Sequence, residues 1–335
     1  MNRDLWLTIK NQIELSKING PTLFIFIIDI FLLLTSWNLF QLGSFFVIIS
    51  YLFASLALLQ FYLILHEATH NAVSTSNFIN SLIGHLCGFL VLMPYLPRQS
   101  SHILHHTWTG HPVRDPANNR MIQKFSVITE KDIMRLETIW KYWIPAIIIN
   151  DRVGLWLSPH KIKKSGQSTQ KIQKELFWNK IYLLNYFLIL AVVIRLGHLG
   201  TFSLWLIPSL FIAFIIEELV NLPHHAETPL VKPTDKAIPY WEQHKVTHSC
   251  QSIPFWSNYI ILNFNLHVAH HFFPTASWNL LTSLDKKIQN NLSEKSNDQI
   301  NEFSWSIKNR PRPLMSLMGH YFNQANLKKQ TVNSE

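Results

Sequence analysis

The sequence predicts an all-α integral membrane protein in which four transmembrane helices form two hairpins and a cytoplasmic helical cap holds a metal site. Three observations lead to this fold class. Apolar residues gather in long blocks, Lys and Arg are nearly absent from two short connections between those blocks, and eight of the 17 histidines form three short clusters. The blocks predict the spans, the basic residues predict their orientation, and the histidines predict the site.

Four segments are nearly free of charge and have lengths near the roughly 20 residues that cross the hydrocarbon of a bilayer. They are residues 22–36, 45–65, 181–194 and 201–216. A short connection joins the first to the second and another joins the third to the fourth, so the spans pair into two hairpins. We expect residues 1–335 to form a single membrane domain built around them.

The basic residues predict which side of the membrane each segment faces. Of the 29 Lys and Arg residues, three precede the first span, 14 lie within residues 66–180 and 11 follow residue 223. The connections, residues 37–44 and 195–200, hold only Arg195. Because cytoplasmic segments carry the excess of Lys and Arg, both termini and the central segment are predicted to be cytoplasmic. The net charge of +9 follows from this topology, and no nucleic-acid partner is expected.

A further apolar segment, residues 79–97, is interrupted by polar residues and by Pro94 and Pro97. Proline removes a backbone donor and breaks a regular helix, and every backbone group in a bilayer must be hydrogen-bonded within the protein. We therefore expect a membrane-embedded or re-entrant segment here instead of a regular fifth span.

The N-terminal segment, residues 1–20, has the pattern of an amphipathic helix. Apolar residues stand at helical spacing among charged ones at Leu5, Trp6, Ile9 and Ile13. Such a helix either lies on the membrane surface or packs against the protein. Residues 325–335 are expected to be a disordered tail.

Three histidine clusters predict a metal site. They are H-E-A-T-H with His66 and His70, H-I-L-H-H with His102, His105 and His106, and H-V-A-H-H with His267, His270 and His271. On a helix, residues spaced i, i+3 and i+4 share one face, so each cluster would direct its imidazoles to one point. Imidazole without a nearby thiolate suits iron, zinc or copper.

The clusters and their spacing resemble the histidine boxes of the membrane fatty acid desaturase and hydroxylase superfamily, over about residues 60–280. In the acyl desaturases of that family, a segment N-x-x-x-H at the end of the last span supplies one more histidine and a weakly held asparagine. Here N-L-P-H-H offers Asn221 and His225. His224 is the alternative to His225, and the i to i+4 relation to Asn221 favours His225.

The resemblance implies a di-metal site with no catalytic residue beyond its ligands. The implied ligands are His66, His70, His102, His105, His106, Asn221, His225, His267, His270 and His271. Nine histidines exceed what one zinc ion can use, because a structural zinc takes four ligands, usually including thiolates. Neutral imidazoles would also hold two cations without cancelling their charge.

The resemblance further implies a fatty acyl desaturase that uses dioxygen and two iron ions to remove two hydrogens from an acyl chain. The substrate would be an acyl lipid, an acyl-CoA or an acyl-carrier species, in a setting of membrane lipids. Cys87 and Cys250 form no C-x-x-C pair and predict neither a disulfide nor an iron-sulfur site. We therefore expect a separate electron donor, a ferredoxin-like or haem protein, to dock on the basic cytoplasmic face.

Two alternatives stay open. Relatives with the same boxes hydroxylate or ketolate alkyl chains or carotenoids. A histidine-rich membrane transporter or metal-handling protein would also gather histidines, but transport sites lie near the bilayer midplane, whereas these clusters lie at and beyond span ends. His267 stands where the front-end desaturases carry glutamine, which disfavours that subgroup.

Ligating histidines usually donate their second N–H to a carboxylate or carbonyl. The candidate carboxylates near the clusters are Glu67, Asp115, Glu217, Glu218 and Glu227. Three further residues near the clusters, Trp108, Thr247 and Trp256, are expected only to line the site. The isolated histidines are predicted to be surface or core residues, and these are His85, His111, His160, His198, His244, His248 and His320.

Overall fold

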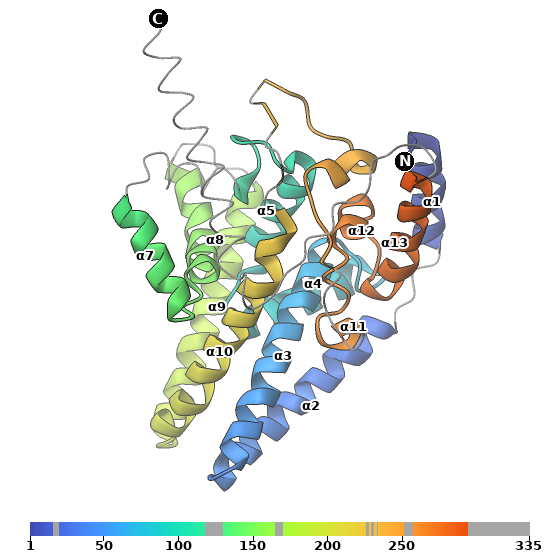
Figure 1. Ribbon diagram of the computed structural model, residues 1–335. Coiled ribbons are helices and arrows are strands. Elements are labelled where there is room, and N and C mark those ends of the chain that lie inside the picture. Colours follow the sequence, from blue (N-terminus) through green and yellow to red (C-terminus); the bar gives the residue numbers. More distant parts are fainter. Residues whose placement is uncertain are drawn as a thin grey trace, which may run out of the picture.

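The computed structural model describes residues 1–15, 20–117, 130–164, 170–225, 228, 231–232, 234–250 and 257–293. The regular elements of this part of the chain are all helices. Two long hairpins, α2 (Pro21–Leu42) with α3 (Phe46–Thr69) and α9 (Gln170–Arg195) with α10 (Leu199–Asn221), extend away from the other helices (Figure 1). All-helical architecture is therefore confirmed over the described residues.

By length and composition, the four helices of these hairpins can each cross a membrane, and the count becomes five if one bent helix pair is a single span. Their outer faces expose large apolar side chains such as Phe24 and Phe31 on α2 and Phe187 on α9. Exposed apolar surface of this extent faces lipid or a partner. The helices thus indicate a membrane protein.

The helices extend beyond the apolar blocks of the sequence. Helix α2 continues to Leu42, so the predicted connection at residues 37–44 is wrong for most of its length, and the chain turns at Gly43 with φ of 70°. Helix α9 begins at Gln170, well before its apolar block. Because an α-helix forms its backbone hydrogen bonds within itself, it can continue through polar residues beyond the apolar block.

Hydrogen bonds between the long helices join the two hairpins. Ser50 Oγ on α3 donates to Ser36 O on α2 at 2.7 Å, and Trp205 Nε1 on α10 donates to Ser36 Oγ at 2.7 Å. Between α3 and α10, Ser55 Oγ donates to Ser209 O at 3.1 Å. Small and polar residues that bridge helices are typical of membrane bundles, and here they set α3 between α2 and α10.

The segment predicted to be interrupted forms two helices, α4 (Asn77–Leu90) and α5 (Tyr95–Trp108), bent by 106°. Pro94 caps the start of α5 with an extended backbone. Gly84 permits the close approach of the two helices, because a Cβ there would lie 2.5 Å from the Tyr95 ring. The bend carries α5 across the end of α3.

Most of the remaining helices lie at the end of the bundle where α3 and α10 end, whereas residues 257–260 lie lower, beside α2 and α3 (Figure 1). The remaining helices are α1 (Arg3–Leu15), α7 (Glu130–Lys141), α8 (Ala146–Lys164), the 3₁₀ turns η1 (Leu222–His225) and η2 (Tyr240–Lys245), α11 (Ser257–Ile260), α12 (His267–Phe272) and α13 (Trp278–Ser293). Together with α5 they form the cap over the long helices.

Helix α1 packs against the cap by its apolar face. Trp6, Ile9 and Ile13 are buried in one cluster with residues of α12 and α13. The Trp6 indole N–H donates to Phe272 O at 2.7 Å. Of the two structures predicted for the N-terminal segment, a helix that packs against the protein is therefore the one observed for this apolar face.

Candidate metal centre

Four elements bring the predicted histidines together. Helix α3 ends beside its histidine pair, α5 carries the second cluster in its last two turns, η1 follows α10, and α12 consists largely of the third cluster. The i, i+3 and i+4 spacing keeps each cluster on one side of its element. Tertiary packing then turns these sides towards one another. The prediction that each cluster directs all of its imidazoles to one point is wrong for two of the three clusters, because His105 joins a different group from His102 and His106. His270 is likewise separated from His267 and His271.

The first group of histidines has five members, which we call the five-histidine group. One ring nitrogen from each lies within 4.8 Å of the corresponding nitrogen of every other member, and all five side chains are buried. The members are His66, His70, His102, His106 and His270. His106 Nε2 lies 3.0 Å from His270 Nε2 and 3.2 Å from His102 Nε2.

The second group has four members, which we call the four-histidine group. Nitrogens of His105, His225 and His271 lie within 4.8 Å of one another. His267 joins them, because its Nε2 lies 3.3 Å from His225 Nε2 and 3.1 Å from His271 Nε2. The two groups are neighbours, since the rings of His106 and His271 have centroids 4.2 Å apart.

The spacing of the nitrogens fits metal ligation. Two ligand nitrogens at right angles around a metal, each about 2.1 Å from it, are about 3.0 Å apart. The Nε2 pairs of both groups are separated by 3.0 to 3.3 Å. In addition, His66 Nε2 and His70 Nε2 are buried without a hydrogen-bond partner among the described residues. Nε2 of His85, His111 and His224 shares this property, so the close spacing of the nitrogens, and not the lack of a partner, distinguishes the two groups.

The electrostatics also suit metal ligation. Burial is the main cause that lowers the pKa values of His70, His267 and His271 well below the usual value, with smaller contributions from neighbouring charges. Burial likewise lowers the pKa of His270 to about 3. Desolvation disfavours the charged imidazolium. These four rings are therefore neutral near pH 7 and keep a lone pair for a metal.

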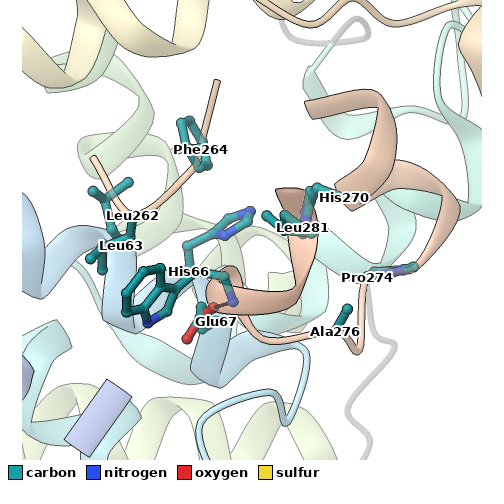
Figure 2. Close-up of a pocket in the computed structure, with 10 residues that line it drawn as sticks. Leu63, His66, Glu67, Leu262, Phe264, His270, Pro274, Ala276 and Leu281 are labelled. Carbon is teal, nitrogen blue, oxygen red and sulfur yellow. Dashed lines mark hydrogen bonds between the residues drawn. The ribbon is translucent and has the colours of Figure 1, made fainter. Parts of the chain in front are cut away.

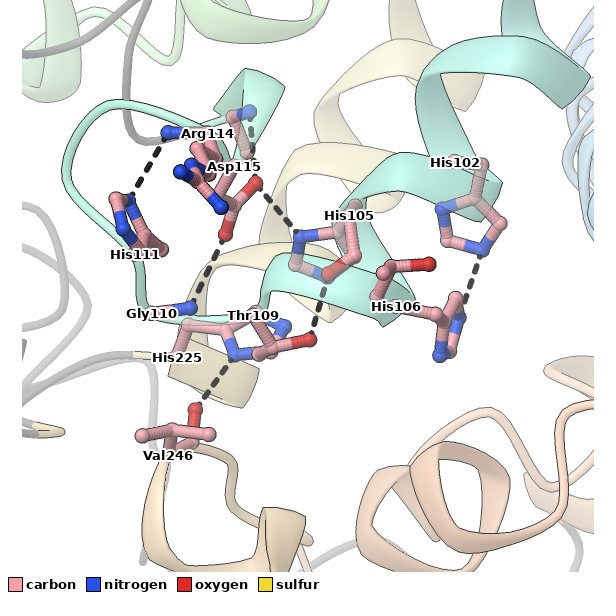
Figure 3. A network of polar contacts seen from close by, with 12 residues as sticks. His102, His105, His106, Thr109, Gly110, His111, Arg114, Asp115, His225 and Val246 are labelled. Carbon is pink, nitrogen blue, oxygen red and sulfur yellow. Dashed lines mark hydrogen bonds and ion pairs between the residues drawn. The ribbon is translucent and has the colours of Figure 1, made fainter. Parts of the chain in front are cut away.

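Hydrogen bonds at Nδ1 fix two rings of the four-histidine group (Figure 3). His105 Nδ1 donates to Asp115 Oδ1 at 3.0 Å, and His225 Nδ1 donates to Val246 O at 3.0 Å. A histidine that donates from Nδ1 presents its Nε2 lone pair to a metal. Both rings are thus held in the tautomer that ligation requires.

Gln243 in η2 makes a third such contact. His271 Nδ1 lies 2.7 Å from Gln243 Oε1, to which it donates. The amide Nε2 of the same residue donates to His106 O at 2.6 Å. Gln243 is only 1% exposed and therefore joins α5 to α12 from within the cap.

An apolar pocket borders the five-histidine group (Figure 2). His66 and His270 form part of its wall. Most of the other lining residues are apolar, among them Leu63, Leu262, Phe264, Ala276, Trp278 and Leu281. The pocket is small and mostly apolar, and two of its lining residues belong to the five-histidine group.

Comparison with known proteins places the chain in a family. The family model for fatty acid desaturase matches residues 25–303, which is most of the chain. The chain belongs to the fatty acid desaturase family. The resemblance read from the histidine boxes is therefore confirmed.

Several curated relatives carry desaturase names. The chloroplastic omega-6 fatty acid desaturase of Arabidopsis thaliana is 25% identical over 252 residues, which cover 72% of this chain and 53% of the relative. The sn-1 oleoyl-lipid 12-desaturase of Anabaena variabilis is 24% identical over 284 residues, covering 81% and 76%. The endoplasmic reticulum omega-3 fatty acid desaturase of Vigna radiata var. radiata is 23% identical over 226 residues, covering 62% and 56%. The chain thus spans little more than half the length of the plant desaturases.

Five carboxylates were expected to contact the histidine clusters of this desaturase-family chain. Asp115 does so, because it accepts a hydrogen bond from His105. Glu67 instead accepts hydrogen bonds from Thr22 Oγ1 at 2.8 Å and from the Trp278 backbone N–H. These bonds tie α3 to α2 and α13. Glu227 lies outside the described residues.

The two acidic residues of α10 contact α8. Glu217 forms a two-pronged ion pair with Arg152, with N to O distances of 3.1 and 2.6 Å. Glu218 Oε2 accepts from the first amides of α8, at Ile147 and Ile148. Both carboxylates therefore anchor α8 on α10, a structural role that the sequence did not distinguish from a role at the metal.

At the end of α10, the structure separates the two adjacent histidines. His225 is a member of the four-histidine group, whereas His224 stacks on His267 with ring centroids 3.9 Å apart. The Asn221 side chain is hydrogen-bonded to protein at both ends: Oδ1 accepts from Tyr62 Oη at 3.1 Å and Nδ2 donates to Glu217 O at 2.7 Å. A ligand role for Asn221 stays a prediction.

Histidines outside the clusters that have polar partners behave as structural residues. His85 Nδ1 lies 2.9 Å from Tyr182 Oη, and its ring stacks on Trp178. His111 Nδ1 accepts from the Val113 and Arg114 amides. His320 and Trp256 lie outside the described residues, as do residues 325–335.

Gln243 is the residue at the centre that the sequence did not indicate. It stands in a polar stretch, and no spacing relates it to a histidine cluster. Val246 acts through its backbone carbonyl, which any residue type would supply. Neither contact has a sequence signal.

Proposed function

We propose that this chain is a fatty acyl desaturase, which uses dioxygen to remove two hydrogens from an acyl chain at a centre of two iron ions. The observation that carries the proposal is the pair of adjacent histidine groups beside an apolar pocket. The family membership supports the same reaction class. One methylene pair and one dioxygen, with two electrons and two protons, would give one double bond and two waters.

The nine histidines would hold the two ions, one in each group. Bound iron would supply the activation of dioxygen that cleavage of an unactivated C–H bond requires. Iron suits a site made of imidazoles, and the neutral rings leave its positive charge uncancelled. Asn221 would be a weak additional ligand through the lone pair of Oδ1 that Tyr62 does not occupy.

The substrate we propose is an acyl chain linked to a lipid, with acyl-CoA and acyl-carrier species as alternatives. The apolar pocket would take part of the chain, because burial of methylene groups is favourable. His66 and His270 would place that part next to the metals. The name of the Anabaena relative, sn-1 oleoyl-lipid 12-desaturase, supports a lipid-linked substrate.

We further propose that four helices span the membrane, with both termini and the metal centre on the cytoplasmic side. The distribution of Lys and Arg supports this orientation. A soluble ferredoxin-like or haem protein would then reach the cap and deliver electrons. Its docking surface would be basic, as the Lys and Arg content of the cap segments indicates.

The test is turnover by purified protein in lipid nanodiscs that carry saturated and monounsaturated acyl chains, with an electron-donor system and oxygen-18 gas. We expect a product lighter by two hydrogens and free of label, and none from His106→Ala. His160→Ala is the matched control, because His160 is exposed on α8. Label in the lipid as a hydroxyl or keto group would refute desaturation, and identical products from the His106 variant would refute the site.

A further inference from the structure

Three polar residues lie four positions before histidines of the two groups. Tyr62 precedes His66 on α3 and Arg98 precedes His102 on α5, whereas Asn221 is the last residue of α10 and precedes His225 of the 3₁₀ turn η1. Residues four apart on an α-helix are stacked on the same face, so Tyr62 and Arg98 lie directly beneath their histidines. Asn221 joins them through its hydrogen bond with Tyr62, and we call the three residues the polar layer.

Hydrogen bonds connect the three members of the polar layer. Arg98 Nη2 donates to Tyr62 Oη at 3.4 Å, and Tyr62 Oη donates to Asn221 Oδ1 at 3.1 Å. Asn221 Nδ2 then donates to Glu217 O at 2.7 Å. The chain of contacts runs from α5 through α3 to α10, and these three helices hold or precede ligands of both histidine groups.

The polar layer is buried and close to the histidines. Tyr62 is 2% exposed, and the Arg98 side chain is 13% exposed. Arg98 lies one helical turn before His102 on α5. A hydrogen bond in such surroundings is costly to lose, because the remaining partner finds no water.

The packing of the ring does not explain why residue 62 is a tyrosine and not a phenylalanine. Its ring lies edge-on to Phe264, with centroids 6.4 Å apart, and a phenylalanine ring would keep this contact. The Arg98 guanidinium also lies over the Tyr62 ring, 5.9 Å from its centroid, and a phenylalanine would keep that contact too. The hydroxyl alone makes the hydrogen bonds to Asn221 and Arg98. Its contribution can therefore be separated from that of the ring by a single substitution.

We propose that the polar layer positions the metal centre: the Tyr62 hydroxyl fixes the side chain of Asn221 and, with Arg98, the relative placement of the ligand-bearing ends of α3, α5 and α10. Tyr62 and Arg98 are positioning residues and touch no metal. The inference rests on the proposed metal centre and adds to it the residues that set its geometry.

The test compares Tyr62→Phe with Tyr51→Phe. Tyr51 is a matched control, because it lies on α3 and its hydroxyl also donates to α10, at Leu204 O with 2.9 Å, but it is about three turns from Tyr62. Both variants lose one hydroxyl that joins the same two helices. Only Tyr62→Phe removes a contact next to the ligands.

Three readouts are measured on purified protein loaded with ferrous iron-57: iron per chain, the rate of iron loss to a chelator, and the Mössbauer spectrum. Loss of a contact behind metal ligands typically weakens metal binding 10- to 100-fold. We expect Tyr62→Phe to lose iron about tenfold faster or more and to show an altered quadrupole splitting. Tyr51→Phe should keep the parental rate and spectrum.

Parental iron loss and spectrum in Tyr62→Phe would overturn the inference, as would equal changes in both variants. A double variant with Asn221→Ala adds a second criterion. If Tyr62 acts through Asn221, the effects of the two substitutions on iron loss are not additive, and strict additivity would also refute the inference. Absence of iron from the parent protein would instead refute the proposed metal centre.

Discussion

Gln243 is the residue whose loss should reveal how strongly the cap holds the metal centre. Replacement by leucine keeps much of the side-chain volume and removes both polar ends. His106 O then loses the donor that lies 2.6 Å away, and His271 Nδ1 loses the acceptor that lies 2.7 Å away and keeps only Thr109 Oγ1 at 3.4 Å. A buried group that loses its partner costs about 1 to 3 kcal/mol. The expected destabilisation is therefore about 1 to 6 kcal/mol.

The same substitution should weaken metal binding, because His271 loses the contact that selects its tautomer. A loss of about 10- to 100-fold in iron affinity is expected. Gln243→Glu separates the two contacts, since a carboxylate accepts from His271 but cannot donate to His106 O. We expect this variant to retain more iron than Gln243→Leu and to be similarly destabilised.

The assay is iron content after exposure to a chelator, together with the thermal unfolding midpoint of protein in nanodiscs. Gln173→Leu is the control, because the Gln173 side chain is exposed on α9. A Gln243→Leu protein that keeps parental iron and a parental midpoint would refute the reasoning. A lower midpoint with unchanged iron would refute the role at His271 alone.

Three further outcomes are expected. His70→Ala and His105→Ala should each lower the iron content of purified protein, because they remove ligands from different groups, and equal loss in His160→Ala would indicate misfolding instead. Topology reporters after Gly43 and Gly197 should be outside the cytoplasm and one after Lys164 inside, and a cytoplasmic reporter at Gly197 would refute the four-span arrangement. Iron-free protein should lose thermal stability as the pH falls from 7 to 5. Burial lowers the pKa of His270 to about 3, whereas a histidine in the unfolded chain has a pKa near 6.5. Protons therefore bind the unfolded chain first and favour unfolding. A midpoint that is flat or rises over that interval would contradict the neutral, buried state of the rings.

Much of this protein could be predicted from residue type and spacing. Blocks such as residues 45–65 require a bilayer or an apolar core whatever their surroundings, because they are long and nearly uncharged. The spacing of His102, His105 and His106 directs all three to one side of a helix, since the helical repeat is a local property. These features depend only on neighbours in the chain, and the structure confirms helices at both places.

The tertiary structure decided how the histidines divide. His105 and His106 are adjacent in sequence, yet one enters the four-histidine group and the other the five-histidine group. Neighbouring residues on a helix point about 100° apart, so two facing elements can each take one of them. Which partner each meets depends on where α12 packs against α5, and that placement involves residues more than 150 positions away.

The hydrogen bonds to the second ring nitrogens of the histidines could not be predicted from sequence spacing either. Gln243 lies in a 3₁₀ turn far from His106 in the chain, and Val246 contributes a backbone carbonyl that carries no side-chain signature. Glu67 and Asp115 both stand near a histidine cluster, but only Asp115 faces a ring, whereas Glu67 turns towards α2 and α13. A sequence records which groups can donate or accept, and packing over long chain distances decides which of them meet.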